Sequence, residues 1–202
     1  MKLYYSPGAC SLASHIALKE AGLSFEAIKV DGRAKKAANG EDYWQVTAKG
    51  YVPALRLDDG SVLTEGTAIL PYIGDRAPAS GLAPAAGTMD RYRVHEWLGY
   101  INSEVHKGFG PFFVPGTSDE AKATAKANLG KRFGFVQQAL EGREFLVGDQ
   151  FTVADAYLFT VLGWTRIVGI DLGEWPVLKA WHAKIAHRPA VQAAMRAEGL
   201  IK

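Results

Sequence analysis

The stretch that decides the fold of the N-terminal part is Leu3-Tyr4-Tyr5-Ser6-Pro7-Gly8-Ala9-Cys10-Ser11. Its first three residues favour a short strand, which Pro7 and Gly8 end. Apolar side chains then recur at helical spacing over residues 11–21, and Gly22 supplies a stop signal. The sequence therefore predicts a strand, a turn and a helix, with Cys10 at the junction between turn and helix.

The following segments extend this unit into a sheet. Residues 25–30 alternate between apolar and polar or small side chains, which predicts a second strand. Segments 54–57 and 61–63 flank Asp58-Asp59-Gly60, a hairpin signal because glycine accepts the positive φ of a tight turn. Residues 66–76 are predicted to be helical. The order β-α-β and then β-β-α predicts an α/β domain over residues 1–76, with helices covering the sheet.

An uncharged segment with two prolines, residues 77–88, is the predicted linker. Beyond it the apolar spacing indicates helices only, so that residues 89–202 are predicted to form an all-α domain. These helices span 89–106, 119–140 and 153–168, with another from Trp175-Pro176 and a last one between Arg188-Pro189 and Gly199. Residues 153–168 are apolar on nearly every side, which predicts a central buried helix.

The composition excludes several classes of protein. The 202 residues include 23 basic and 21 acidic side chains, a balance that does not suit a nucleic-acid binder. The longest stretch without such charges, residues 3–18, is shorter than the roughly 20 residues of a membrane span. A single cysteine excludes internal disulfides and multi-cysteine zinc sites, and its free thiol suits the reducing cytoplasm. We expect no metal, no nucleic acid and no membrane partner.

Cys10 is the first candidate for chemistry, because it stands at the predicted start of a helix. Free amide groups and the positive end of the helix dipole favour a thiolate there, whether that of Cys10 or of a ligand. We therefore expect the Cys10 pKa to lie below the ordinary value of about 8.5. The alternative is a buried, inert side chain. No second cysteine follows Cys10 at the spacing of a dithiol motif.

Other candidates stand at turns and on one helical stripe. Glu65 and Gly66 lie where the hairpin enters a helix, which suits either ligand binding or a plain helix cap. His106 ends a polar stripe that also contains Gly99, Asn102 and Ser103. Asp155 completes a capping box with Thr152, with Phe151 as its hydrophobic staple, and is predicted to be structural.

Four motifs together resemble the bacterial beta class of cytosolic glutathione transferases, over essentially the whole chain. They are Tyr4-Tyr5-Ser6-Pro7-Gly8-Ala9-Cys10-Ser11, Val52-Pro53-Ala54-Leu55, Leu63-Thr64-Glu65-Gly66 and Asn102-Ser103-Glu104-Val105-His106-Lys107-Gly108-Phe109. The resemblance implies a thioredoxin-like N-terminal domain, an all-α C-terminal domain, a homodimer, and glutathione as co-substrate. It also implies a role in detoxification.

The resemblance further implies a role for individual residues. Cys10 and His106 would face the glutathione sulfur, and His106 would favour its anionic form. Val52, before a cis proline, would pair with the cysteinyl part. Glu65 and the Gly66 amide would hold the γ-glutamyl end, and Lys35 the glycine carboxylate. Ser103 and Glu104 would be contributed across the dimer interface.

Three departures from the family pattern concern affinity. Gly66 stands where many relatives carry serine, Gly99 stands where they often carry asparagine, and Pro71 interrupts the helix after Glu65. The expected acceptor site lies between the domains, with candidate residues Phe109, Phe112, Phe113, Trp164 and Ile167. Rival interpretations are disulfide exchange or peroxide reduction through a Cys10 mixed disulfide, and a non-catalytic binding module.

Overall fold

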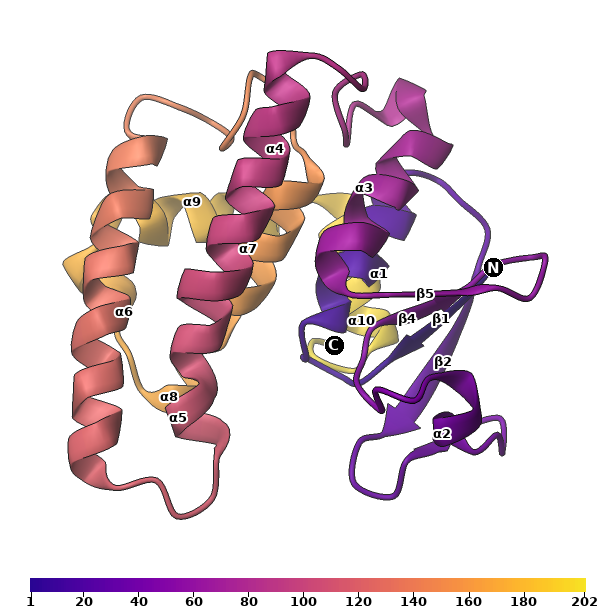
Figure 1. Cartoon of the computed structure of the whole chain (residues 1–202). Helices are drawn as coiled ribbons and strands as arrows, with labels where there is room; N and C mark the ends of the chain where they lie inside the picture. The colour runs from indigo at the N-terminus through magenta and orange to yellow at the C-terminus, as the bar shows by residue number, and fades with distance from the viewer.

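The computed structural model describes all 202 residues and has a sheet domain followed by helices (Figure 1). The strands are β1 (Lys2–Tyr5), β2 (Glu26–Asp31), β3 (Lys36–Ala37), β4 (Ala54–Arg56) and β5 (Val62–Thr64). Strands β1, β2, β4 and β5 confirm the four predicted strands. Their order in the sheet is β3-β2-β1-β4-β5, with β1 and β2 parallel and the other neighbours antiparallel. The hairpin between β4 and β5 turns at Gly60, whose φ is +86°.

Helices of the sheet domain lie on both of its faces. They are α1 (Ser11–Glu20), α2 (Tyr43–Val46) and α3 (Gly66–Arg76). Alternation along β1 explains the two faces, because successive side chains of a strand point in opposite directions. Leu3 and Tyr5 join the main core with α1 and α3, whereas Tyr4 joins a smaller core with Tyr43 of α2. Figure 1 shows α1 and α3 between the strands and the helical domain.

The C-terminal part is all-α, as predicted. After a short 3₁₀ turn, η1 (Pro78–Ser80), it comprises α4 (Met89–Tyr100), the π-helix η2 (Ile101–His106), η3 (Lys107–Phe109), α5 (Gly110–Phe113), α6 (Asp119–Leu140), α7 (Val153–Gly163), α8 (Thr165–Val168), η4 (Leu172–Glu174), α9 (Pro176–Ala186) and α10 (Pro189–Ala197). Two predicted helices were wrong in detail. The helix over 89–106 changes to π geometry at Ile101, and the one over 153–168 breaks at Trp164.

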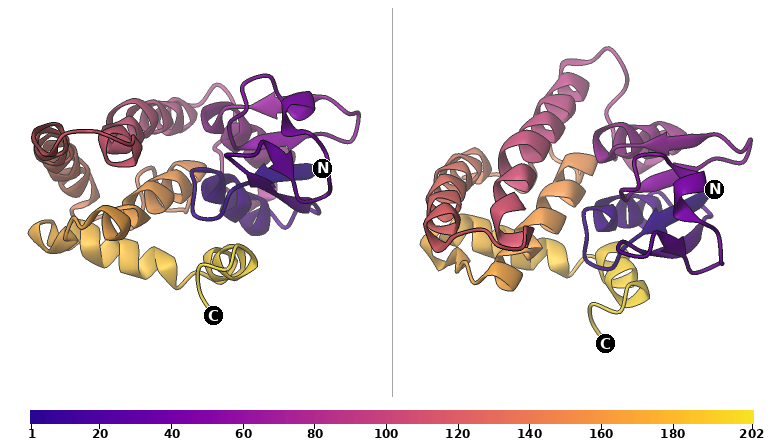
Figure 2. Two further views of the ribbon diagram at one scale, coloured as in Figure 1. Left: turned by 90° about the horizontal axis from the view of Figure 1, so that it is seen from below. Right: turned by 60° about the horizontal axis from the view of Figure 1, so that its bottom comes forward.

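The last helix returns to the sheet domain. Both views in Figure 2 place α10 beside α1, and α1 also packs against α3 and α7. Just beyond α10, the buried carboxylate of Glu198 lies 3.0 Å from Nδ1 of His15 and accepts a hydrogen bond from the Gly8 amide at 2.9 Å. This buried contact fixes the turn that precedes Cys10.

The predicted structural role of Asp155 agrees with its contacts. Its carboxylate is buried at the start of α7 and accepts hydrogen bonds from the Thr152 amide (2.8 Å), the Thr152 hydroxyl (2.8 Å) and the Leu146 amide (2.9 Å). Burial raises the pKa of Asp155 to about 6, against the opposite effect of these donors. The side chain thus ties the loop before α7 to the most buried helix.

Replacing Asp155 with alanine should therefore lower the free energy of unfolding by about 1–3 kcal/mol, because two buried amides would lose their partner. Urea unfolding measures the change. Asp149→Ala is the control, since Asp149 is exposed in the same loop and makes no hydrogen bond. Equal stability of the two variants would refute the role given to Asp155.

Candidate functional site

The turn that carries Cys10 is held from the helical domain. The indole Nε1 of Trp164 donates a hydrogen bond of 2.8 Å to the Gly8 carbonyl. The amide of the same glycine donates to the Glu198 carboxylate. Cys10 is the N-cap of α1, as the sequence predicts. Its side chain therefore has a fixed place at the junction of the two domains.

Cys10 is partly exposed, and its thiol acts as a hydrogen-bond donor. Its Sγ donates to the Val52 carbonyl at 3.4 Å. Burial raises the Cys10 pKa to about 11, although the amides of Cys10 and Ser11 and the charge of Lys107 act to lower it. The expectation of a lowered pKa is therefore wrong for the free protein. The start of α1 does stabilise a thiolate, but the loss of hydration destabilises the thiolate by more, so that the pKa rises.

A cavity of about 340 Å³ opens beside this thiol. The peptide bond between Val52 and Pro53 in its wall is cis, as the resemblance implies. The amides of Val52 and Gly66 make no hydrogen bond within the chain, so both can bind a ligand. The cavity is lined by Cys10, Lys49, Tyr51, Val52, Pro53, Thr64, Glu65, Gly66, Leu70, Asn102, His106, Lys107 and Tyr157.

Glu65 has an unusual backbone in this wall. Its φ is +70°, a region that side chains other than glycine seldom occupy and that costs on the order of 1–3 kcal/mol. The residue is the N-cap of α3, yet its carboxylate makes no cap hydrogen bond. It instead pairs with Nζ of Lys49 at 2.6 Å and remains 62% exposed. The strained residue therefore holds a carboxylate available to a ligand.

A second cavity, of about 430 Å³, adjoins the first through Cys10, His106 and Lys107. Three of the expected acceptor residues line it, namely Phe113, Trp164 and Ile167. Phe113 and Ile167 are exposed at its rim. Phe109 does not take part, because it is fully buried against Phe133 and Trp164. Phe112 also packs against the core, outside the lining.

His106 lies between the two cavities. Its ring packs edge-on against Trp164 with centroids 4.7 Å apart, and its Nδ1 lies 2.6 Å from the Tyr157 hydroxyl. Burial, with a smaller effect from Lys107, lowers the His106 pKa to about 4. The imidazole is therefore neutral near pH 7.

Three residues named by the resemblance do not line either cavity. Lys35 lies behind the wall, where its Nζ donates to the Gly50 carbonyl at 2.7 Å and lies 5.6 Å from the ring centroid of Tyr51. Ser103 donates to the Gly99 carbonyl, and Glu104 pairs with Arg132 of α6 at 2.9 Å. Their predicted contacts with glutathione therefore require either movement or a second subunit.

The sequence interpretation assigned no ligand role to six polar residues that line the cavity, namely Lys49, Tyr51, Thr64, Asn102, Lys107 and Tyr157. Tyr157 had a usable signal. A hydroxyl within an otherwise apolar helix needs a partner, which points to a polar surface inside the fold. Lys49 had none, because its pairing with Glu65 depends on the tertiary path of the loop before Val52.

The structure contains no cluster of three or more His, Cys, Asp or Glu side chains that could hold a metal ion. None of its helices has the length and apolar character required to cross a membrane.

Comparison with known proteins identifies the family. Residues 8–76 match the model of the glutathione S-transferase N-terminal domain, and residues 100–189 match that of the C-terminal domain. The chain is 48% identical to the glutathione S-transferase GstA of Escherichia coli O157:H7 over 99% of this chain and 100% of that one. The chain belongs to the glutathione S-transferase family.

Solved structures of family members agree with this fold over the full chain. A sphingomonad glutathione S-transferase complexed with glutathione is 54% identical with a TM-score of 0.96, covering 100% of both chains. The beta-class glutathione S-transferase of Sphingomonas chungbukensis is 50% identical with a TM-score of 0.96, again over 100% of both chains. The predicted fold and the resemblance to the beta class are confirmed, and the protein is a glutathione S-transferase enzyme.

Proposed function

We propose that this glutathione S-transferase binds glutathione in the cavity beside Cys10 and activates its thiol for attack on electrophilic small molecules. One observation carries the proposal: a single cavity joins two free backbone amides, an available carboxylate and the start of α1. Glutathione offers a complementary set of groups, since it has an ammonium, two carboxylates, an extended peptide backbone and a thiol.

The groups of the cavity match glutathione in order. The Glu65 carboxylate suits the ammonium of the γ-glutamyl end, and the Gly66 amide at the start of α3 suits its carboxylate. The free amide and the carbonyl of Val52 suit the peptide backbone of the cysteinyl part, as an added strand would pair. We assign the glycine carboxylate to Lys35, whose ammonium would leave the Gly50 carbonyl to reach it.

The sulfur of glutathione would then lie near Cys10, at the start of α1. Because the Cys10 thiol is protonated, we assign the nucleophilic role to the glutathione sulfur and a donor role to Cys10. The electrophile would occupy the adjoining cavity, against Phe113, Trp164 and Ile167. A detoxification role in the cytoplasm suits this chemistry, because reduced glutathione and a lone thiol both persist in a reducing compartment.

A second candidate function is thiol–disulfide exchange or peroxide reduction through Cys10. The position of Cys10 in both cavities favours it, since a disulfide or peroxide in the acceptor cavity would reach its sulfur. This route requires the Cys10 thiolate, which the raised pKa makes scarce near pH 7.

Calorimetric titration with glutathione, followed by turnover of halides, epoxides, peroxides and mixed disulfides, tests both candidates. The proposal expects binding and conjugation of halides or epoxides. Turnover confined to mixed disulfides and peroxides would favour the second candidate, and the absence of glutathione binding would refute both.

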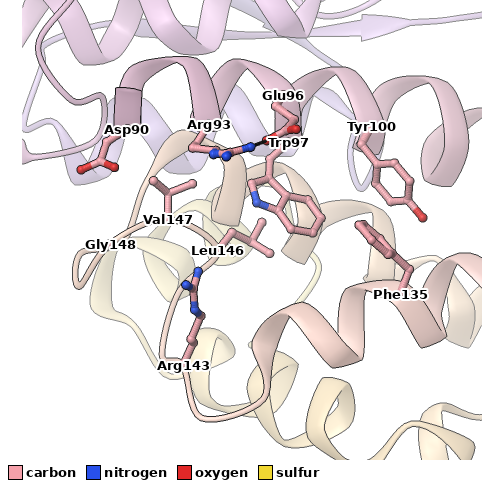
Figure 3. A pocket seen from close by; sticks show the side chains of 10 residues that line it. All are labelled: Asp90, Arg93, Glu96, Trp97, Tyr100, Phe135, Arg143, Leu146, Val147 and Gly148. Atoms are coloured by element: carbon pink, nitrogen blue, oxygen red, sulfur yellow. Dashed lines mark hydrogen bonds and ion pairs between the residues drawn. The ribbon is translucent and has the colours of Figure 1, made fainter. Parts of the chain in front are cut away.

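We also propose that the enzyme is a homodimer whose partner covers the outer face of α4 and α6. A cavity of about 680 Å³ lies there, with aromatic side chains from both helices around it (Figure 3). Trp97 and Tyr100 pack on the half-exposed Phe135 with ring centroids 5.8 and 5.0 Å away. Further along, the Glu104–Arg132 ion pair joins α6 to η2, which directly follows α4. Such an exposed aromatic face suits a protein partner.

The dimer leads to a prediction at Gly99. A Cβ at this position would meet no atom within 4 Å, so Gly99→Asn fits without strain. If the interface completes the glutathione site, the new amide should tighten glutathione binding, and dilution should lower activity per subunit unless glutathione is present. Sedimentation and calorimetry measure these effects. A fully active monomer would refute the dimer, and unchanged or weaker binding by Gly99→Asn would refute the cross-subunit contact.

A further inference from the structure

Three polar side chains form a chain of hydrogen bonds behind the sulfur site. Nδ1 of His106 lies 2.6 Å from the Tyr157 hydroxyl, which donates to Oδ1 of Asn102 at 3.0 Å. Asn102 and His106 both belong to the π-helix η2, whereas Tyr157 comes from α7. The wide turn of a π-helix brings residues four or five positions apart to one side, so both can reach one hydroxyl.

The number of hydrogens available to these three side chains determines which ring nitrogen of His106 carries a hydrogen. A tyrosine hydroxyl carries one hydrogen, and here that hydrogen goes to Asn102. Burial raises the pKa of Tyr157, so the hydroxyl keeps its hydrogen at every physiological pH. The contact between Tyr157 and His106 therefore requires the hydrogen to be on Nδ1 of His106. A neutral imidazole with its hydrogen on Nδ1 has a lone pair on Nε2.

The other ring nitrogen is available to a ligand. Nε2 of His106 makes no hydrogen bond within the protein. It is also not buried, because Ser14 Oγ is the only buried side-chain nitrogen or oxygen atom without a partner. His106 lines both cavities. The pKa of about 4 keeps the ring neutral, so that Nε2 presents an acceptor and not a donor.

We propose that Tyr157 and Asn102 are positioning residues that hold His106 as a hydrogen-bond acceptor, so that its Nε2 takes the thiol proton of glutathione bound beside Cys10. This inference rests on the proposed function. In the step, the S–H bond of glutathione breaks, an N–H bond forms at Nε2, and sulfur keeps the electron pair. The thiolate left beside the ring raises the His106 pKa above its value of about 4 in the free protein, and the imidazolium then releases its proton to water or to the leaving group.

The resemblance implies that His106 favours the anionic form of the glutathione sulfur, and one way to do so is a hydrogen bond donated by the ring to the thiolate. Such a bond needs a hydrogen on Nε2, which the chain through Tyr157 places on Nδ1 instead. The thiolate would be stabilised by the amides of Cys10 and Ser11 at the start of α1. Besides Tyr157, the charged or titratable groups that share the cavity with His106 are Cys10, Lys49, Tyr51, Glu65 and Lys107.

The state of the ring can be measured in the free protein. Nitrogen-15 NMR of imidazoles at pH 7 should show His106 with a protonated Nδ1 and an unprotonated Nε2, and His106→Gln assigns the signal among the five histidines. In Tyr157→Phe the two tautomers should interconvert. A hydrogen on Nε2 in the wild type, or an unchanged spectrum in Tyr157→Phe, would overturn the proposal whether or not glutathione binds.

Turnover provides the second measurement. Tyr157→Phe should lose about tenfold in kcat, a part of the roughly 10²–10⁴-fold that a general base contributes, with KM for glutathione unchanged. Tyr92→Phe, which removes an exposed hydroxyl from α4, is the matched control and should keep full activity. A raised KM with normal kcat in Tyr157→Phe would mean that the hydroxyl binds glutathione directly and would also overturn the proposal.

A substitution at Asn102 keeps the test valid if Tyr157→Phe does not fold. Asn102→Asp retains an acceptor for Tyr157 and should keep the Nδ1 hydrogen, while its negative charge raises the His106 pKa and moves the acid limb of the pH–rate profile upward. Asn102→Leu should instead resemble Tyr157→Phe. Identical pH–rate profiles for the two Asn102 variants would contradict the proposed role of the hydrogen bonds from His106 through Tyr157 to Asn102. A failure of the proposed function is separate, because it would be seen as no glutathione binding in the wild type.

Discussion

Replacing Cys10 with alanine should abolish every thiol–disulfide reaction of the enzyme and leave conjugation measurable. Exchange would need the Cys10 thiolate to attack a glutathione mixed disulfide, forming a Cys10–glutathione disulfide and releasing the other thiol. A second glutathione thiolate would then attack that disulfide, yielding oxidised glutathione and the Cys10 thiolate. Cys10 is the only cysteine in the chain, so no other residue can replace it in this cycle.

Conjugation should survive because bound glutathione supplies its own sulfur. Cys10→Ser is the matched variant, since its hydroxyl retains a donor where the thiol now donates to the Val52 carbonyl. We expect both variants to lack exchange and Cys10→Ser to conjugate better than Cys10→Ala. If either variant loses conjugation together with exchange while still binding glutathione, Cys10 forms a covalent intermediate in both reactions.

The rate of Cys10 alkylation, measured against pH, shows whether burial raises the pKa of the thiol or the start of α1 lowers it. With a pKa of about 11, the thiolate fraction at pH 8 is about one in a thousand, and the rate should rise about tenfold per pH unit between 8 and 10. The pKa is raised, so the reactive form increases only as pH approaches that value. A rate that levels off near pH 8 would show that the start of α1 outweighs burial.

Much of the fold could be predicted from local patterns, because each long element carries its own periodicity. The elements that were missed are those without a local signal. Strand β3 has two residues and exists because Ala37 pairs with Val30 across the sheet. Helix α2 has four residues, and its packing of Tyr43 against Tyr4 is a long-range contact. The residue at the helix break, Trp164, likewise makes a long-range contact, because its indole donates a hydrogen bond to the Gly8 carbonyl.

The site shows the same division between local and tertiary causes. The place of Cys10 at a helix start follows from its neighbours in sequence, and that prediction is confirmed. Its pKa depends on what covers the thiol, and that cover comes from α7, η2 and the loop at Val52. The partner of Glu65 is another tertiary feature, because Lys49 reaches it from a loop 16 residues earlier.

Replacing Glu65 with alanine should raise the KM for glutathione by about 5- to 150-fold, equivalent to roughly 1–3 kcal/mol for an ammonium left without its partner. The kcat should fall less than kcat/KM, since Glu65 binds the end of glutathione remote from the sulfur. Steady-state kinetics with glutathione varied, together with calorimetry, measure both quantities. Unchanged glutathione affinity in a folded variant would mean that the γ-glutamyl end binds elsewhere.

A matched control exists at another ion pair of the same kind. Lys184 and Glu144 are 2.7 Å apart and 55% and 67% exposed, close to the 2.6 Å, 51% and 62% of Lys49 and Glu65. Such exposed pairs contribute about 0–1 kcal/mol to stability, so both alanine variants should fold normally. Glu144→Ala should leave glutathione kinetics unchanged. Any loss of affinity confined to Glu65→Ala is then due to its position in the cavity and not to loss of an ion pair.

The backbone of Glu65 makes a stronger version of this test possible. At φ +70° glycine avoids the steric penalty that glutamate carries, so Glu65→Gly should be at least as stable as the wild type to urea. The same variant lacks the carboxylate and should bind glutathione as poorly as Glu65→Ala. A residue that costs stability and supplies affinity is expected at a binding site, where strain is retained because the side chain is needed there. If Glu65→Gly is both stabilised and fully active, the carboxylate has no role in binding.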